Sequence, residues 1–218
     1  MNFYTNQTKI MIQSAKLSVL LWFLIAILSV DKFCITQVGG TLQLANSITT
    51  QDIIAGDIFF EVIEPTELEY TYRLRPAKDF GGSFNVKLEG VALVPTVPLH
   101  ACSPITNKRD LRGNVALIER GECSFLKKTI NAESAGAAAA IITEFNSESN
   151  EFDFYIEMIH DNSDKDAHIP AGFLLGKNGM AIRSTLKKLK RSYALINLPV
   201  NLTFIPPHKI NHPPWLGW

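Results

Sequence analysis

The run of residues 115–128 (VALIERGECSFLKK) constrains the fold of this chain more than any other stretch. Residues 115–118 are apolar and rich in branched side chains, a composition typical of a short strand that is covered on both faces. Arg120 and Gly121 end this strand, because glycine accepts the backbone angles that close a turn. The run therefore predicts a buried strand that leads through a turn into the next element.

A helix is predicted directly after that turn. Ser124 can cap its first turn, and apolar side chains then recur at helical spacing as far as Ile130. Gly136 favours the end of the helix, and residues 137–142 (AAAAII) have the composition of a second buried strand. We expect the two strands to be parallel and the connection between them to be right-handed.

The residues of this unit form the motif Arg120-Gly121-x-Cys123-x-Phe125 between a VALIE strand and a helix that runs into AGAAAAII. This arrangement resembles the protease-associated (PA) domain. Further segments carry the resemblance in the same order along the chain: residues 76–82 (PAKDFGG), 154–159 (FYIEMI), 169–176 (IPAGFLLG) and 213–215 (PPW). The resemblance covers roughly residues 57–218.

The resemblance implies a mixed α/β fold that consists of a single PA domain. In such a domain, short β-strands form a small sheet or barrel-like core, with a strand–helix–strand unit and flanking helices. PA domains are generally inserts in, or companions of, proteases, receptors and ubiquitin ligases. The resemblance therefore implies a module that performs no chemistry of its own, and it supplies no known ligand.

The rest of the chain also predicts a compact mixed α/β domain, because short strand-like runs come first and alternating strand and helix units follow. One segment, residues 154–159, fits either a strand or a helical turn. A basic amphipathic helix is predicted at residues 180–191. The other predicted strands are 58–63 and 70–74, which we expect to be antiparallel, and 91–94, 169–175 and 194–202.

Residues 1–36 predict a signal peptide, with cleavage at about residues 34–40. Lys9 and Lys16 precede an uncharged apolar run at 17–30 (LSVLLWFLIAILSV). This run is long enough for a signal-peptide core and shorter than the ~20 residues needed to span a bilayer. An uncleaved signal anchor and a misassigned start codon are the alternatives. The predicted location is therefore the lumen of the secretory pathway or the outside of the cell.

The remaining chain divides into three predicted parts. Residues 37–56 are polar and predict a flexible mature N-terminus, residues 57–204 form the PA domain, and residues 205–218 form a tail rich in proline and tryptophan. Exposed tryptophans in the tail would make a binding patch. We expect instead that the tail folds back and covers the domain, because a free aromatic tail favours aggregation.

The three cysteines predict one disulfide bond. Cys34 lies in or beside the leader, so Cys102 and Cys123 remain in the mature chain. In an oxidising compartment an even number of cysteines is expected to be paired. The alternatives are a redox-active pair or a metal-binding pair, but neither cysteine has a second cysteine within four residues, as local metal sites require.

Asn201-Leu-Thr203 is an N-glycosylation sequon, since the middle position is not proline. It follows an apolar strand-like run and precedes two prolines, which places it at a surface edge. Asn6-Gln-Thr8 also matches, but it lies in the leader. We therefore expect a glycan at Asn201.

Charge and motifs exclude several classes of function. Lys and Arg number 21, as do Asp and Glu, so the net charge is zero and no footprint for nucleic acid is present. Neither G-x-S-x-G nor H-E-x-x-H occurs, so no hydrolase motif is recognised. We expect no cofactor, and no membrane association once the leader is cleaved.

One loop carries side chains that could bind a metal ion. Oxygen ligands could suit a hard cation and two imidazoles could suit zinc, but the spacing matches neither an EF-hand nor a helical H-x-x-x-H site. A solvated acidic loop is the favoured interpretation. The residues concerned are His160, Asp161, Asp164, Asp166 and His168.

The prediction for function is a secreted, non-catalytic PA-domain glycoprotein that binds an unknown protein or peptide. The resemblance makes Arg120, Gly121, Lys78 and Asp79 the candidate ligand surface, and a peptide could also add along an open strand edge. The alternatives are an accessory or inhibitory subunit of a separate protease, or a signal-anchored sorting receptor. The basic helix at 180–191 is interpreted as a solvated face, with an acidic partner or a cell-surface polysaccharide as the alternative.

Overall fold

The computed structural model describes residues 56–216. The predicted signal peptide, Cys34 and nearly all of the predicted flexible N-terminus lie outside these residues. Among the residues described, no helix is both long enough and apolar enough to cross a membrane.

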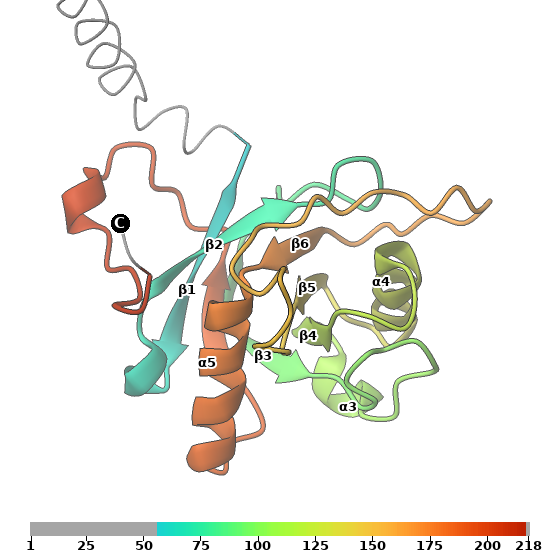
Figure 1. Ribbon diagram of the computed structural model, residues 1–218, viewed down its shortest axis with the longest axis horizontal. Helices are drawn as coiled ribbons and strands as arrows, with labels where there is room; N and C mark the ends of the chain where they lie inside the picture. The colour runs from blue at the N-terminus through green and yellow to red at the C-terminus, as the bar shows by residue number, and fades with distance from the viewer. Residues whose placement is uncertain (1–55, 217–218) are drawn as a thin grey trace, which may run out of the picture. The chain divides into compact units, whose positions relative to one another are not determined.

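The described chain forms seven strands, three α-helices and two 3-10 helices (Figure 1). In chain order they are β1 (Ile58–Glu64), η1 (Thr66–Leu68), β2 (Thr71–Pro76), β3 (Leu88–Pro95), α3 (Lys108–Leu111), β4 (Val115–Glu119), α4 (Phe125–Ser134), β5 (Ala139–Thr143), β6 (Ala171–Leu174), α5 (Gly176–Lys188), β7 (Ala194–Leu198) and η2 (Pro207–Lys209). This order confirms the predicted mixed α/β class.

The seven strands close into a barrel in the order β1-β2-β6-β5-β4-β3-β7, with β7 pairing back onto β1. Strands β3, β4, β5 and β6 are mutually parallel neighbours, and the remaining pairs are antiparallel. The predicted barrel-like core and the parallel pairing within the strand–helix–strand unit are confirmed. Every described strand has a neighbour on both sides, so the predicted peptide addition along an open strand edge is wrong.

The parallel strands are buried on both faces, which explains their continuous apolar sequence. In β4, Val115 and Leu117 join the core that includes the side chains of β1, β2 and β7 and is covered by α5. Ala116 and Ile118 alternate with them and join a second core beneath α3 and α4. Figure 1 shows α4 and α5 at different sides of the barrel.

Helix α4 begins and ends where the sequence predicts. The Ser124 hydroxyl accepts a hydrogen bond from Lys127 N at 3.1 Å and so satisfies one of the free backbone donors of the first turn. Gly136 follows the helix with φ +90°, a left-handed conformation that favours glycine. The predicted cap and the predicted stop are both confirmed.

We expect Ser124→Ala to lower the free energy of unfolding by about 1 kcal/mol, because it removes this cap together with the hydrogen bond from the Ser124 hydroxyl to Asp161. Ser134→Ala is the matched control: its exposed hydroxyl donates only to Ile130 O at the other end of the same helix, and we expect a change within about 0.5 kcal/mol. Urea unfolding of both variants measures the difference. If Ser124→Ala and Ser134→Ala lower the free energy of unfolding equally, the cap contributes no more stability than an ordinary exposed hydroxyl.

Two predicted elements differ from the structure. Residues 154–159 form neither strand nor helix but an extended cover, in which Met158 is buried and the Tyr155 ring lies 4.9 Å from the Arg73 guanidinium carbon. Helix α5 begins at Gly176, four residues before the predicted start. Its first turn packs closely on its surroundings, since a Cβ at Gly176 would lie 2.6 Å from Phe152 O.

The C-terminal tail folds back onto the domain at Trp215. The Trp215 indole Nε1 donates to Asn178 Oδ1 in the first turn of α5 at 2.9 Å. The same ring meets Tyr70 edge-on, with ring centroids 5.5 Å apart. The predicted fold-back is confirmed for Trp215, whereas Trp218 lies outside the described residues.

Candidate ligand-binding site

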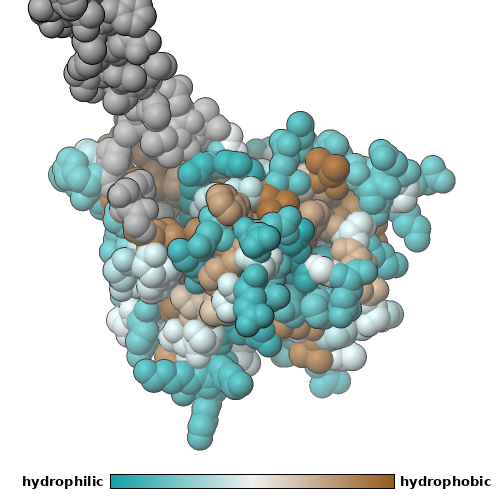
Figure 2. All heavy atoms as spheres, viewed as in Figure 1, coloured by the Kyte–Doolittle hydropathy of each residue, from teal (hydrophilic) through white to brown (hydrophobic). Residues whose placement is uncertain are grey.

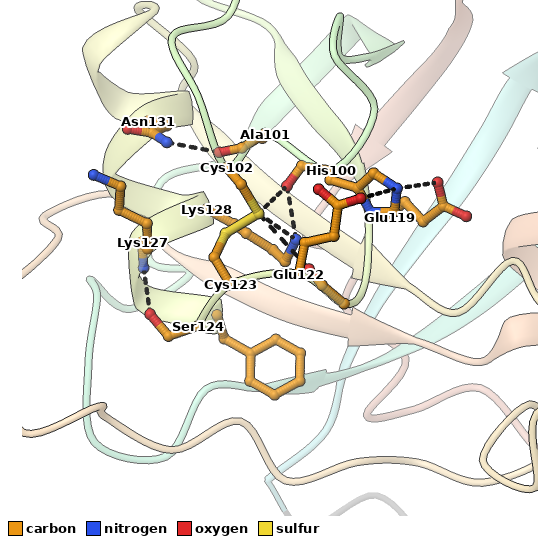
Figure 3. The surroundings of a disulfide bond; sticks show 12 residues. His100, Ala101, Cys102, Glu119, Glu122, Cys123, Ser124, Lys127, Lys128 and Asn131 are labelled. Atoms are coloured by element: carbon orange, nitrogen blue, oxygen red, sulfur yellow. Dashed lines mark hydrogen bonds and ion pairs between the residues drawn. A yellow bond between two sulfur atoms is a disulfide. The ribbon is translucent and has the colours of Figure 1, made fainter.

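A disulfide bond joins Cys102 to Cys123, with their Cα atoms 5.8 Å apart (Figure 3). Cys102 lies in the connection between β3 and α3, and Cys123 lies in the turn just before α4. The bond therefore ties the long loop after β3 to the start of α4. The predicted pairing is confirmed.

A buried lysine lies against this disulfide. Lys128 is 0% exposed, and its Nζ donates to His100 O at 2.7 Å and lies 3.4 Å from Cys102 Sγ (Figure 3). Removal from water lowers the pKa of Lys128 from 10.5 to about 8, although Glu122 and Glu119 act in the opposite direction. Lys128 is not among the site residues predicted from the sequence. Its spacing, three residues after Phe125 on the helix, was the available signal.

The pKa of Lys128 predicts an unusual pH dependence. Between pH about 8 and 10.5 the folded chain has lost this proton while the unfolded chain keeps it, so stability rises with pH across that window. Lys128→Met removes the group, and the stability of wild type relative to this variant is therefore expected to increase from pH about 7 to about 9.5.

Urea unfolding at several pH values tests this expectation. Lys127→Met is the matched control, because Lys127 is the exposed neighbour on the same helix, and its pH profile should run parallel to that of wild type. A Lys128→Met profile that also runs parallel to wild type would contradict the assigned pKa.

Charged side chains gather where the parallel strands end. His100 Nε2 lies 3.3 Å from a carboxylate oxygen of Glu119 and 3.3 Å from one of Glu122. The Arg120 guanidinium pairs with Glu144 at 3.4 Å and with Glu151. We call this set the rim; its members are His100, Glu119, Arg120, Glu122, Glu144 and Glu151.

The topology brings the rim together from separate loops. β4 ends at Glu119 and β5 ends at Thr143, and Arg120 N donates to Thr143 O at 2.9 Å. Glu119 N donates to Leu99 O at 2.9 Å, which places the loop after β3 on the other side. The carboxyl ends of parallel strands meet at one side of a sheet, where ligands of open α/β sheets commonly bind.

The second predicted pair lies elsewhere. Lys78 and Asp79 follow β2, which runs antiparallel to β6, so they lie beyond the amino end of β6. Lys78 pairs with Glu157 at 3.3 Å, and Asp79 accepts a hydrogen bond from His160 N at 2.6 Å. The structure therefore places the two predicted pairs at opposite ends of the parallel strands.

A shallow groove of about 400 Å³ accompanies the Lys78–Asp79 loop. Gly81 and Gly82 form its floor close to the chain before β6, since a Cβ at Gly81 would lie 2.9 Å from Ile169 O. Asp166 contributes a carboxylate to the lining. The groove is an open polar surface and not an enclosed cavity.

The loop with metal-like residues uses many of its polar atoms to hold its own shape. Ser124 donates to Asp161, and this hydrogen bond is the main reason that the pKa of Asp161 falls to about 2. His160 Nδ1 accepts from Asn162 N at 2.9 Å, and His168 Nδ1 lies 3.1 Å from Glu133. Within residues 56–216, no group of three or more such side chains could hold a metal ion.

The sequon lies on the surface after β7. Asn201 is exposed, and its Oδ1 accepts hydrogen bonds from Thr203 N at 3.0 Å and from the Thr203 hydroxyl at 2.6 Å. Both sequon side chains are therefore at the surface. Glycosylation itself stays a prediction.

Comparison with known proteins agrees with this architecture. The family model of the PA domain matches residues 88–182. The chain is 69% identical to the PRADC1-like protein of Drosophila melanogaster over 182 residues, which cover 84% of this chain and 93% of that protein. It is also 32% identical to human ER degradation-enhancing alpha-mannosidase-like protein 3, over 46% of this chain and 11% of that protein.

Among solved structures, an aminopeptidase from Aneurinibacillus sp. strain AM-1 matches with a TM-score of 0.48 and 22% identity. The match covers 66% of this chain and 30% of the aminopeptidase. The high identity to the fly protein along almost its whole length, together with the family model, shows the relationship. The chain therefore belongs to the PA-domain family, and within it to the proteins that resemble the fly PRADC1-like protein.

Proposed function

We propose that this chain is a secreted, N-glycosylated, non-catalytic PA-domain protein that binds a protein or peptide through its rim. The observation that carries the proposal is the position of Arg120. Its guanidinium is held between two carboxylates, where side chains from three separate loops meet at the ends of the parallel strands. Loops held by a firm scaffold are the usual place for recognition.

The closed barrel supports recognition through loops. A peptide that added a strand would need a free edge, and each described strand is already paired on both sides. The disulfide and the buried Lys128 hold the loop after β3 against the start of α4. The rim is thus presented with little freedom to lose on binding, which favours affinity.

The charge of the rim favours a basic ligand. Four carboxylates face one guanidinium and one imidazole, so the rim carries excess negative charge. Glu122 and Glu151 are the most accessible, with side chains 62% and 49% exposed. A ligand segment with lysine or arginine would complement this charge and be steered towards it.

A non-catalytic role is supported by how the reactive side chains near the rim are used. The two cysteines are bonded to each other, and the Ser124 hydroxyl caps a helix while donating to Asp161. The ring nitrogens of His100, His160 and His168 contact backbone or carboxylate groups, and not the hydroxyl or thiol that a base would activate as a nucleophile.

Secretion is supported by three features. The apolar run at residues 17–30 follows basic residues, as in a signal peptide. The disulfide suits an oxidising compartment, and the sequon is exposed. Each feature fits the lumen of the secretory pathway or the extracellular space.

The test begins with the full-length chain, tagged at its C-terminus and expressed in cultured cells. We expect the protein in the medium, with an N-terminus at about residues 34–40 and a loss of mass on N-glycosidase treatment. Cross-linking and mass spectrometry of the medium then compare wild type with the rim variant Arg120→Gln/Glu122→Gln. We expect the rim variant to lose its cross-linked partner.

Lys78→Gln/Glu157→Gln is the matched control, because it removes one cation and one anion at the opposite end of the strands. Loss of the partner in this control alone would move the ligand site to the groove beside Lys78. Recovery of a product that begins at Met1 would replace secretion with a signal anchor. A captured protease whose activity changes in the complex would favour the accessory or inhibitory role.

A further inference from the structure

Five cations cluster around the end of α5. The run 186–191 (LKKLKR) contains four of them, and one helical turn earlier Arg183 lies on the same face as Lys187. All five side chains are exposed. We call them the basic patch; its members are Arg183, Lys187, Lys188, Lys190 and Arg191.

The way in which α5 ends places these cations on several sides of its C-terminus. Arg191 N donates to Leu186 O at 2.9 Å and Lys190 N donates to Lys187 O at 3.2 Å, the pattern with which a helix closes through a left-handed residue. Lys190 is that residue, with φ +53°. The chain therefore turns sharply at Lys190, and cations before and after the turn surround one helix end, where the helix dipole favours positive charge.

Lysine is an unusual choice at this position. Glycine is the common residue there, because a left-handed conformation costs other residues roughly 1–2 kcal/mol. Residues held in costly conformations cluster at functional sites. Lys190 keeps the cationic run continuous around the turn.

The lysines of the patch are available to a ligand. In the described chain, Lys187, Lys188 and Lys190 form no ion pair, while Arg191 pairs with Glu64 at 2.7 Å. The whole sequence has no net charge, so the patch is a local excess of positive charge on a protein that is neutral overall. Figure 2 shows hydrophilic residues covering the end of the molecule where α5 finishes.

We propose that the basic patch binds a sulfated polysaccharide. Runs of lysine and arginine of this length are typical of sites for heparin-like polyanions. Such a ligand needs closely spaced exposed cations and no pocket, which is what the end of α5 offers. A membrane-binding helix would add a face of exposed large apolar side chains to its charged face. No large apolar side chain within α5 is exposed, and in the run 186–191 Leu189 alone is, at 36%.

The patch is separate from the rim. Helix α5 begins directly after β6, at the carboxyl end of the parallel strands where the rim lies. Its 13 residues then run away from that end. At a rise of 1.5 Å per residue the helix ends about 18 Å further on. The patch therefore goes beyond the proposed protein-binding function, and both surfaces can be occupied at once.

The test is binding of the full chain to immobilised heparin, measured between about 50 and 200 mM NaCl. We expect Lys187→Gln/Lys188→Gln/Lys190→Gln to weaken binding about tenfold or more at the higher salt and to reduce the slope of log affinity against log salt by roughly 2–3. Circular dichroism establishes that the variant is folded.

Lys108→Gln/Arg109→Gln/Arg112→Gln is the matched control, because it removes three exposed cations from the region of α3. It should bind heparin like wild type. Equal binding by the α5 variant and wild type overturns the proposal, as does an equal loss in both variants. Undiminished binding to desulfated heparin, or binding to polyglutamate or anionic vesicles but not to heparin, also overturns it.

Discussion

Cys102→Ala/Cys123→Ala is expected to lower the free energy of unfolding by about 3 kcal/mol. The bond joins positions separated by 21 residues, and in the chain-entropy model a loop of this size constrains the unfolded chain by about that amount. For a domain of this length the loss corresponds to a melting temperature lower by about 6–12 °C. Urea unfolding followed by tryptophan fluorescence measures the change.

The reduced wild type is the control for this variant. With reductant present, wild type should unfold at the same urea concentration as the double variant, and reductant should leave the variant unaffected. If reductant leaves the wild-type midpoint unchanged, the bond does not contribute to stability.

Gly179→Ala is expected to destabilise the protein by about 1–3 kcal/mol, as overpacking of a core commonly does. At an exposed helical position the same change would stabilise by roughly 1 kcal/mol, since alanine is the better helix former. Here an added Cβ would lie 2.5 Å from Thr143 Cγ2 and 2.8 Å from Thr143 Cβ. Urea unfolding of the variant determines the sign of the effect.

Thr143→Ala supplies the control and the rescue. The Thr143 hydroxyl is buried and has no hydrogen-bond partner among residues 56–216, so its removal offsets part of the cost of the lost methyl group. We expect Gly179→Ala/Thr143→Ala to be more stable than the sum of the two single changes predicts, by about 1 kcal/mol or more. If the stability changes of the two single variants simply add in the double variant, the contact between Gly179 in α5 and Thr143 in β5 is not the cause of the destabilisation.

The local parts of this fold could be predicted from the sequence because each depends on neighbouring residues. The β4–α4–β5 unit has its strand composition, its Ser124 cap and its Gly136 stop within one short stretch. The start of α5 was missed for the same reason: Gly176 and Gly179 indicate a loop until the close contacts of this turn with Phe152 and Thr143 are known.

Barrel closure and Lys128 depend on distant parts of the chain. Pairing of Val62 with Ile196 closes the barrel, and no local pattern distinguishes that from an open sheet. A lysine in a helix is normally solvated, and the burial of Lys128 follows only from the loop that the disulfide draws over it. The candidate ligand residues were found through the family resemblance, but their placement at opposite ends of the strands required the topology.

The closure of the barrel has a consequence for how such a domain can be joined to others. Because β7 returns antiparallel to β1, the chain leaves the barrel beside the point where it enters, and Val200 N donates to Phe59 O at 2.7 Å. Two ends this close could be spliced into a single surface loop of a host protein without distorting either partner.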